Sequence, residues 1–485
     1  MGRTFFITTL GCPKNVSDSR QMRRSLIREG YEPAGDPYSA DYHVINSCAF
    51  VESAREETIQ TVLEGADIKK SHPGQRLILA GCFTQRYQEA VNEELPEVDL
   101  SFGTGLYHRT GEMLRDKFGA PPVHDALEPS VFSGLEYDGQ PYAPVKLSEG
   151  CDRKCSFCAI PSFRGSFRSR SELEILEEIQ ELTAEGVREV CLVSQDTNAY
   201  GGDPQKILDV IARMHEIPDL EWIRLLYMYP DARTRRFLEG WNHEALPRLV
   251  PYLESPVQHA SSRMLKAMNR AGSRGQFADL FSLARRQAPG LEIRTSLLIG
   301  FPGEKASDID EIHAFLDECK PEKLALFAYS PEEGTGGFDL PGMASAEETA
   351  DIINEIRQHH LEILKEVHLN RQDRIYQCMI DEIHADGMVV RREQDAPEVD
   401  EVIHIEFDSA SESDVDARDI YPGDLVEVKV TGFYEYDMIG ELLPPCSARS
   451  IPAAHSVGLN PGAHSPEPDI HAAAQKPKTR KEGRG

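Results

Sequence analysis

The chain has 485 residues, a length typical of about three globular domains, and its hydrophobic content of 40% is enough for ordinary packed cores. A formal net charge of −29 argues against broad, nonspecific binding to nucleic acid. No apolar run reaches about 18 residues and the amino terminus lacks a signal-peptide layout, so we expect a soluble, cytoplasmic protein without a membrane span. Ten cysteines are too sparse for a disulfide scaffold in a chain of this length, and six of them fall into two sets that suit thiolate ligands.

Residues 1–120 alternate short apolar strands with amphipathic helices, which predicts a parallel α/β domain of mixed α/β class. The expected strands are 4–10, 42–45 and 77–80. A cysteine follows each strand, in the order Cys12, Cys48 and Cys82. Taken singly, each of these cysteines is more often a small buried hydrophobe. Because parallel strands end at one edge of their sheet, three equivalent placements favour a shared metal-cluster site.

Residues 121–141 are rich in Pro, Gly and acidic residues and are interpreted as an interdomain linker. Residues 142–370 repeat strand and helix signals six times, which predicts a partial parallel barrel. Its strands are expected at 142–147, 190–193, 222–226, 256–258, 293–299 and 324–327. Function is expected at the carboxyl ends of these strands, where several polar motifs stand.

Three cysteines within eight residues, Cys151, Cys155 and Cys158, follow the first strand of this barrel. This spacing lets three thiolates reach one iron-sulfur cube and leaves one of its irons open to another ligand. A structural zinc ion is the alternative, but it would need a fourth protein ligand, and residues 159–163 contain neither Cys nor His. An open iron in an enzyme is where a substrate or cofactor binds, so the motif predicts a catalytic cluster.

The carboxy-terminal part of the chain begins with a long helix predicted from Ser345 to Leu369, whose Ser345 and Glu348 have the spacing of a capping box. Residues 371–443 are rich in β-branched and turn residues and predict a small antiparallel β-barrel. Residues 444–485 lack apolar periodicity and end in a run of basic residues. We expect this tail to be disordered.

The Cys-x3-Cys-x2-Cys motif, with Phe157 before its third cysteine, resembles that of the radical S-adenosylmethionine (SAM) enzymes. The resemblance implies that the open iron chelates the methionine part of SAM, and that an electron from the reduced cluster cleaves the cofactor to give a 5'-deoxyadenosyl radical. Such a radical takes hydrogen from unactivated carbon. The protein then positions and shields the reacting groups, while the cofactor supplies the chemistry.

Residues 1–443 together resemble the methylthiotransferases, which insert a sulfur-methyl group at an inert carbon. This resemblance implies a second four-iron, four-sulfur cluster on Cys12, Cys48 and Cys82, two clusters in all, and a TRAM-like carboxy-terminal barrel. Several short sequence motifs resemble those of the branch that modifies an aspartate β-carbon in protein twelve of the small ribosomal subunit. The matching segments are residues 11–15, 160–165, 168–170, 329–335, 396–400 and 435–438.

Two residues of the barrel depart from the pattern of that branch. Ile439 stands where an aromatic residue is expected, and Glu401 stands where a glycine is common. Both lie in the barrel segment, so we expect these departures to affect the contacts of the barrel with its partner and to leave the chemistry intact.

The other candidate site residues carry weaker signals. Gln195 follows the second barrel strand and could contact the amino group of SAM, although an ordinary loop amide explains it equally well. Gly300 and Gly303 could let the backbone approach the adenosine, but a Pro-Gly turn often serves geometry alone. Asp196 and His259 could handle protons, whereas a capped or solvated polar residue at a loop start is commoner.

The leading hypothesis is therefore a protein-modifying methylthiotransferase with a basic ribosomal protein as substrate and a separate electron donor protein. A methylthiotransferase acting on a transfer RNA adenosine is the nearest alternative, and a non-catalytic, zinc-bearing RNA-binding protein is a second. Residues 371–441 contain six Arg or Lys against twenty Asp or Glu. We expect this acidic barrel to bind RNA weakly or not at all and to attract a basic protein.

Overall fold

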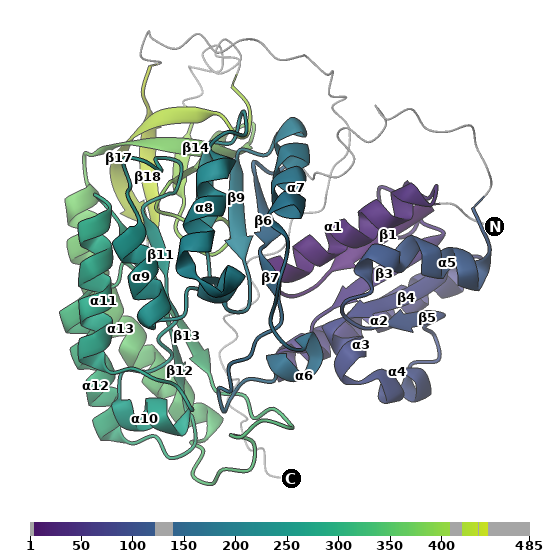
Figure 1. Ribbon diagram of the computed structural model, residues 1–485, viewed down its shortest axis with the longest axis horizontal. Coiled ribbons are helices and arrows are strands. Elements are labelled where there is room, and N and C mark those ends of the chain that lie inside the picture. The colour runs from purple at the N-terminus through teal and green to yellow at the C-terminus, as the bar shows by residue number, and fades with distance from the viewer. Residues whose placement is uncertain (1–3, 122–138, 408–419, 435, 445–485) are drawn as a thin grey trace, which may run out of the picture. The chain divides into compact units, whose positions relative to one another are not determined.

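The structure is a computed structural model that describes residues 4–121, 139–407, 420–434 and 436–444 (Figure 1). Most of the expected linker, and the expected tail apart from Pro444, lie outside the described residues. Within the described part of the chain, no helix has both the length and the apolar character needed to cross a membrane.

The amino-terminal part is a five-stranded parallel sheet in the order β2-β1-β3-β4-β5. The strands are β1 (Thr4–Thr9), β2 (Glu32–Pro33), β3 (Tyr42–Ser47), β4 (Arg76–Gly81) and β5 (Leu100–Phe102). Its helices are α1 (Pro13–Arg28), α2 (Glu52–Ser71), α3 (Cys82–Arg86), α4 (Gln88–Glu94) and α5 (Thr110–Phe118). The central strand β3 is buried throughout, and its alternating side chains feed two cores, Tyr42 and Val44 on one face and Ile45 on the other. The three strands expected from the sequence are confirmed.

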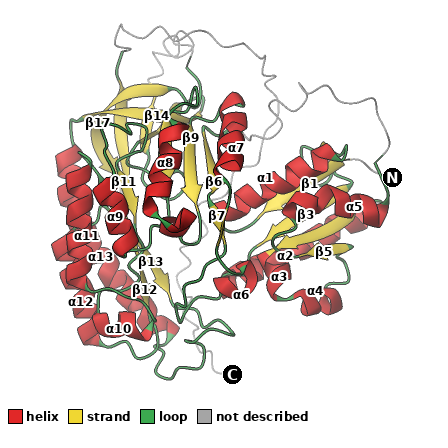
Figure 2. Ribbon diagram, in the orientation of Figure 1, coloured by secondary structure: helices red, strands yellow, loops and turns green. Residues whose placement is uncertain are grey.

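The central part contains six parallel strands, each followed by helices (Figure 2). The strands pair as two sheets, β10-β9-β6 and β11-β12-β13. They are β6 (Tyr142–Lys146), β9 (Glu189–Val193), β10 (Trp222–Leu225), β11 (Tyr252–Glu254), β12 (Glu292–Ile299) and β13 (Lys323–Ala328). The helices around them are α7 (Glu172–Ala184), α8 (Pro204–Met214), α9 (Ala232–Gly240), α10 (Ser262–Ala267), α11 (Arg274–Gln287), α12 (Ala306–Cys319) and α13 (Ala346–Arg371). Strand and helix residues share one large apolar core, as a partial barrel requires.

One strand expected in this region is placed wrongly by the sequence pattern. The fourth strand is β11 at Tyr252–Glu254, and residues 256–258 form only an isolated bridge between Gln258 and Leu297. Pro256 has no N–H to donate to a ladder, and Gln258 has a φ of 71°, outside the extended region. The apolar signal of this segment therefore belongs to the turn that follows the strand.

The carboxy-terminal part begins after α13, whose first turn has the predicted capping box between Ser345 and Glu348. It forms a closed barrel in the order β14-β15-β16-β18-β17. These strands are β14 (Ile375–Ile383), β15 (Gly387–Arg392), β16 (Ile403–Glu406), β17 (Leu425–Tyr434) and β18 (Asp437–Leu442). The predicted barrel is confirmed, with one correction: β16 and β18 pair in parallel. The chain passes from β16 to β17, which lies between β14 and β18, and then returns antiparallel along β18 to the side of β16.

Candidate metal centres and cofactor site

The structure brings the three amino-terminal cysteines to one edge of the first sheet. Cys12 is the N-cap of α1, Cys48 follows β3, and Cys82 begins α3 directly after β4. Gly11 has a φ of 92°, and a Cβ atom there would lie 2.9 Å from the Cys48 sulfur, so only glycine permits this close approach. Burial raises the pKa of the Cys82 thiol to about 12. Cys48 and Cys12 lie near enough to add to this rise.

A buried guanidinium contacts this cysteine set from the central part of the chain. Arg164 closes the short helix α6 (Ile160–Arg164) and is 4% exposed. Its Nε donates to the Cys82 sulfur at 3.1 Å, and its Nη1 lies 2.7 Å from a carboxylate oxygen of Asp18. Asp18 also pairs with Lys146 of β6. Sequence reasoning missed Arg164 as a site residue, although it lies within the segment 160–165 that carries the family resemblance.

The Cys-x3-Cys-x2-Cys loop runs between β7 (Ser148–Glu149) and α6, after the first strand of the barrel. The Cys151 N–H donates to the carbonyl of Gly165, and the backbone N–H of Arg153 lies 3.4 Å from the Cys151 sulfur. Burial raises the pKa of Cys151 to about 11 and that of Cys158 to about 12, with smaller contributions from the neighbouring thiols of the loop. Cys151 and Cys158 thus lie in a partly water-excluded place, near enough to Cys155 for the thiols to interact.

A cavity of about 440 Å³ lies against this loop. Cys155 lines it together with the exposed ammonium groups of Lys154 and Lys266. Tyr229 lies between two guanidiniums there, with the Arg153 carbon 3.6 Å and the Arg270 carbon 4.2 Å from the centre of its ring. Arg270 also donates to the Cys155 sulfur at 3.6 Å. The cavity is therefore basic in a chain that is acidic as a whole.

Gln195 lies near the cysteine loop with one of its amide atoms unused. Its Nε2 donates to Glu149 at 3.1 Å, and Glu149 lies two residues before Cys151. Its Oε1 is buried and has no hydrogen-bond partner among the described residues. A buried acceptor without a donor is costly, so this oxygen suits a bound group that donates an N–H.

The remaining candidates are held by contacts within the protein. The N–H of Gly300 donates to Glu304 and the N–H of Gly303 donates to the carbonyl of Gly342, so both serve the turn itself. Asp196 is buried in an ion pair with Arg153. His259 is fully buried and its Nε2 lies 3.1 Å from a carboxylate oxygen of Glu304. Their expected contacts with the cofactor and with protons stay predictions.

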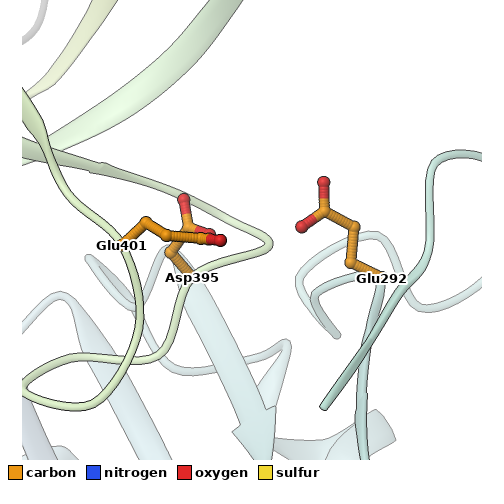
Figure 3. Close-up of side chains that lie close together, drawn as sticks. All are labelled: Glu292, Asp395 and Glu401. Atoms are coloured by element: carbon orange, nitrogen blue, oxygen red, sulfur yellow. The ribbon is translucent and has the colours of Figure 1, made fainter. Parts of the chain in front are cut away.

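The described residues contain one further set of possible metal ligands, the carboxylates of Glu292, Asp395 and Glu401 (Figure 3). Three buried cations already contact this set: Lys323, Arg371 and Arg392. Three carboxyl groups meet three cations, so the geometry is that of an ion-pair network linking the barrel to the core. Glu401 is 6% exposed within it, which corrects the expectation that this residue alters contacts with a partner. Ile439 is 42% exposed on β18 and remains compatible with that expectation.

The cysteines outside the two sets pack as apolar residues. Cys191, Cys319 and Cys378 are each buried within a hydrophobic cluster. Cys446 lies outside the described residues. Each of the two sets, by contrast, has guanidinium or amide N–H groups directed at a sulfur, which suits thiolates that carry an anionic cluster.

Models of known families match three successive parts of the chain. The family described as Uncharacterized protein family UPF0004 matches residues 4–103, the Radical SAM superfamily matches 145–316, and the TRAM domain matches 374–443. With the cysteine loop after the first strand of a partial barrel, these matches define the class: a radical SAM enzyme with a TRAM domain. The predicted fold class is confirmed.

Full-length relatives narrow this class to one family. Ribosomal protein uS12 methylthiotransferase RimO of Leptospira biflexa is 44% identical over 448 residues, which cover 90% of this chain and 96% of that protein. RimO of Acetivibrio thermocellus is 34% identical over 455 residues, 90% of this chain and 98% of that protein. The chain belongs to the ribosomal protein uS12 methylthiotransferase family. Among solved structures, the radical SAM methyltransferase TsrM of Kitasatospora setae is similar at 14% identity and a TM-score of 0.49, over 70% of this chain and 77% of that one.

Proposed function

We propose that this chain attaches a methylthio group to the β-carbon of an aspartate in ribosomal protein uS12, in the cytoplasm. The observation that carries the proposal is the presence of two converging cysteine sets in one chain that covers 96% of a uS12 methylthiotransferase. Replacing hydrogen by sulfur at an inert carbon needs a radical generator and a separate carrier of sulfur. Two cysteine sets supply ligands for both.

In this proposal Cys151, Cys155 and Cys158 hold the [4Fe–4S] cluster that binds SAM, and Cys12, Cys48 and Cys82 hold an auxiliary [4Fe–4S] cluster. When bound, the clusters and SAM supply the radical and the sulfur carrier. Hydrogen bonds from Arg270 and from the N–H of Arg153 stabilise the thiolates of the first set. In the second set Arg164 serves Cys82 in the same way.

The protein also shields the reacting groups. Phe157, between the second and third cysteines of the loop, packs against a small apolar cluster of Met264, Met268, Leu298 and Phe301, together with Tyr329. Such a wall helps to exclude water from the cysteine loop. We assign to the Gln195 Oε1 the amino group of SAM, because this buried acceptor lies beside Glu149 at the start of the cysteine loop.

The choice of a protein over transfer RNA rests on the charge of the barrel. Three of the six cations in residues 371–441, namely Arg371, Arg391 and Arg392, are buried in ion pairs with carboxylates. Among the described residues of that segment, this leaves Arg374 and Lys429 outside the core. An acidic surface repels phosphates and speeds encounters with a basic ribosomal protein.

We infer that reducing electrons come from a separate, acidic electron donor protein that approaches the basic cavity at Cys155. Lys154 and Lys266 border this cavity and form no ion pair with a described residue. Charge complementarity of this kind steers a transient encounter. Because Cys155 lines the same cavity, a donor there would lie close to a cluster ligand.

Mass spectrometry of a deletion strain tests the proposed function. In the parent strain, ribosomal protein uS12 should carry a methylthio group in place of one hydrogen, and in the deletion strain this added mass should be absent. The transfer RNA nucleosides should be the same in both strains. Complementation by the intact gene should restore the modification. An unmodified transfer RNA adenosine, with uS12 modified as in the parent, would contradict the proposal and favour the RNA substrate.

A further inference from the structure

Arg164 touches one cysteine set while belonging to the segment that follows the other. It stands six residues after Cys158, and the carbonyl of the next residue, Gly165, accepts the N–H of Cys151 at 3.1 Å. Its guanidinium donates from Nε to Cys82 and from Nη2 to the side-chain oxygen of Asn15, at 2.7 Å. Residues 164 and 165 together thereby connect both candidate cluster sites.

We propose that Arg164 is the positioning residue of the auxiliary site, holding the Cys82 thiolate by its Nε–H and stabilising the reduced state of the cluster bound there. The inference rests on the proposed function, in which Cys82 is a cluster ligand. It adds a specific role to a residue that the reaction scheme alone does not require.

The geometry favours this role over that of a simple clamp between the two parts of the chain. Nη1 and Nη2 already bind Asp18 and Asn15, and these two contacts would be enough to hold the segments together. The Nε–H is left for the sulfur and meets it at 3.1 Å in a place where water is excluded. Hydrogen bonds to cluster sulfurs and nearby positive charge raise the reduction potential, because the reduced cluster is the more negative form.

The charges around Arg164 support the same conclusion. Asp18 is shared between Arg164 and Lys146, and Glu149 contacts the same two cations. Lys14, at the start of α1, adds a third buried cation, stacked 3.2 Å from the centre of the Tyr227 ring. The carboxyl group of Glu254 also acts on Lys14, so three cations face three carboxyl groups here, and the guanidinium of Arg164 is a cation in direct contact with a sulfur of this cysteine set.

The test uses a parent protein in which Cys151, Cys155 and Cys158 are all replaced by Ala, so that only the auxiliary cluster is loaded. Two variants, Arg164→Gln and Arg164→Lys, are made in this parent, and the cluster is titrated with a reductant at fixed potentials while its electron paramagnetic resonance signal is recorded. We expect the ratio of reduced to oxidised cluster to fall about tenfold in both, which for a one-electron couple corresponds to about 59 mV. Lysine retains the charge that pairs with Asp18, but its single ammonium cannot serve Asp18, Asn15 and Cys82 together.

Arg20→Gln is the matched control. Arg20 is also buried, on α1. Its Nη1 donates to the carbonyl of Pro144 in β6 and lies 3.6 Å from a carboxylate oxygen of Glu178, so it too connects the amino-terminal and central parts. The reduction potential of the auxiliary cluster in the Arg20→Gln variant should equal that in the parent. Arg164 variants with the potential of Arg20→Gln would overturn the inference. A parent that binds no iron would instead refute the auxiliary cluster of the proposed function.

Discussion

At the scale of single residues, the two cysteine sets have matched surroundings, and separate duties are proposed for them. Each combines buried thiols, whose pKa burial raises, with N–H donors directed at a sulfur. The donors are different residues: Arg164 reaches Cys82 and Arg270 reaches Cys155, each from a distant segment, and the N–H of Arg153 adds a donor within the cysteine loop itself. The two sites should therefore be separable by mutation.

Replacing Cys151, Cys155 and Cys158 together by Ala should remove about half of the iron and all reductive cleavage of SAM, because the radical needs the open cubane. Replacing Cys12, Cys48 and Cys82 should also halve the iron but leave that cleavage intact. Iron analysis and chromatography of 5'-deoxyadenosine check both results. Loss of 5'-deoxyadenosine from the amino-terminal variant, with its other cluster still loaded, would show that the sites are not independent.

The unpaired Oε1 of Gln195 gives a second residue-scale prediction. Gln195→Leu should weaken SAM binding roughly tenfold or more, the cost of losing a hydrogen bond to a charged group. Equilibrium binding to the reconstituted protein measures this change, with iron content as the check on loading. Gln180→Leu, an exposed glutamine on α7, should bind SAM like the parent. Equal affinity in both variants would remove Gln195 from the cofactor site.

At the scale of elements, the segment between β15 and β16 attaches the barrel to the core through buried charges. Glu401 belongs to this segment, and burial raises its pKa to about 7 although Lys323 and Arg371 act in the opposite direction. A glutamate in an unfolded chain titrates near about 4.3. The folded state therefore binds the proton of Glu401 more tightly than the unfolded state does. The resulting contribution to folding stability is full at low pH and is lost as the pH rises through about 7.

Glu401→Gln cannot titrate, so its melting temperature should fall less than that of the parent between about pH 5.5 and about pH 8. Thermal unfolding followed by circular dichroism measures the difference. Glu406→Gln, which changes an exposed carboxylate on β16, should keep the pH dependence of the parent. Parallel curves for Glu401→Gln and the parent would show that the carboxyl is already ionised throughout this range.

At the scale of the whole molecule, acidic and basic surfaces have different expected partners. The barrel should bind uS12 with an association rate that falls as salt rises, and transfer RNA should not compete. Changing Glu406, Glu427 and Glu441, all exposed in the barrel, to Lys should slow association with uS12 several-fold. Stopped-flow or biosensor measurements at two salt concentrations check this, and tighter binding of transfer RNA by the parent would contradict it.

The basic cavity gives the complementary prediction. Lys154→Glu with Lys266→Glu should slow reduction of the cluster by an acidic flavoprotein several-fold, since both ammonium groups border the cavity at Cys155. Reduction by dithionite, which needs no protein docking, reports on the cluster itself and should proceed in full. If the flavoprotein reduces the variant as fast as the parent, donor and cavity do not meet.

The sequence by itself determined the features that depend on local patterns. Apolar periodicity located the strands of both parallel layers, cysteine spacing identified the radical SAM loop, and Ser345 and Glu348 predicted the start of α13 correctly. The misplaced strand at 256–258 shows the limit of such patterns, because hydrophobicity cannot tell a strand from the turn after it. Only the tertiary structure decided that Arg164 contacts Cys82, 82 residues earlier, and that Glu401 is buried against Lys323 of the core. Contacts between segments far apart in the chain depend on how the sheets and helices pack, and no local pattern records that packing.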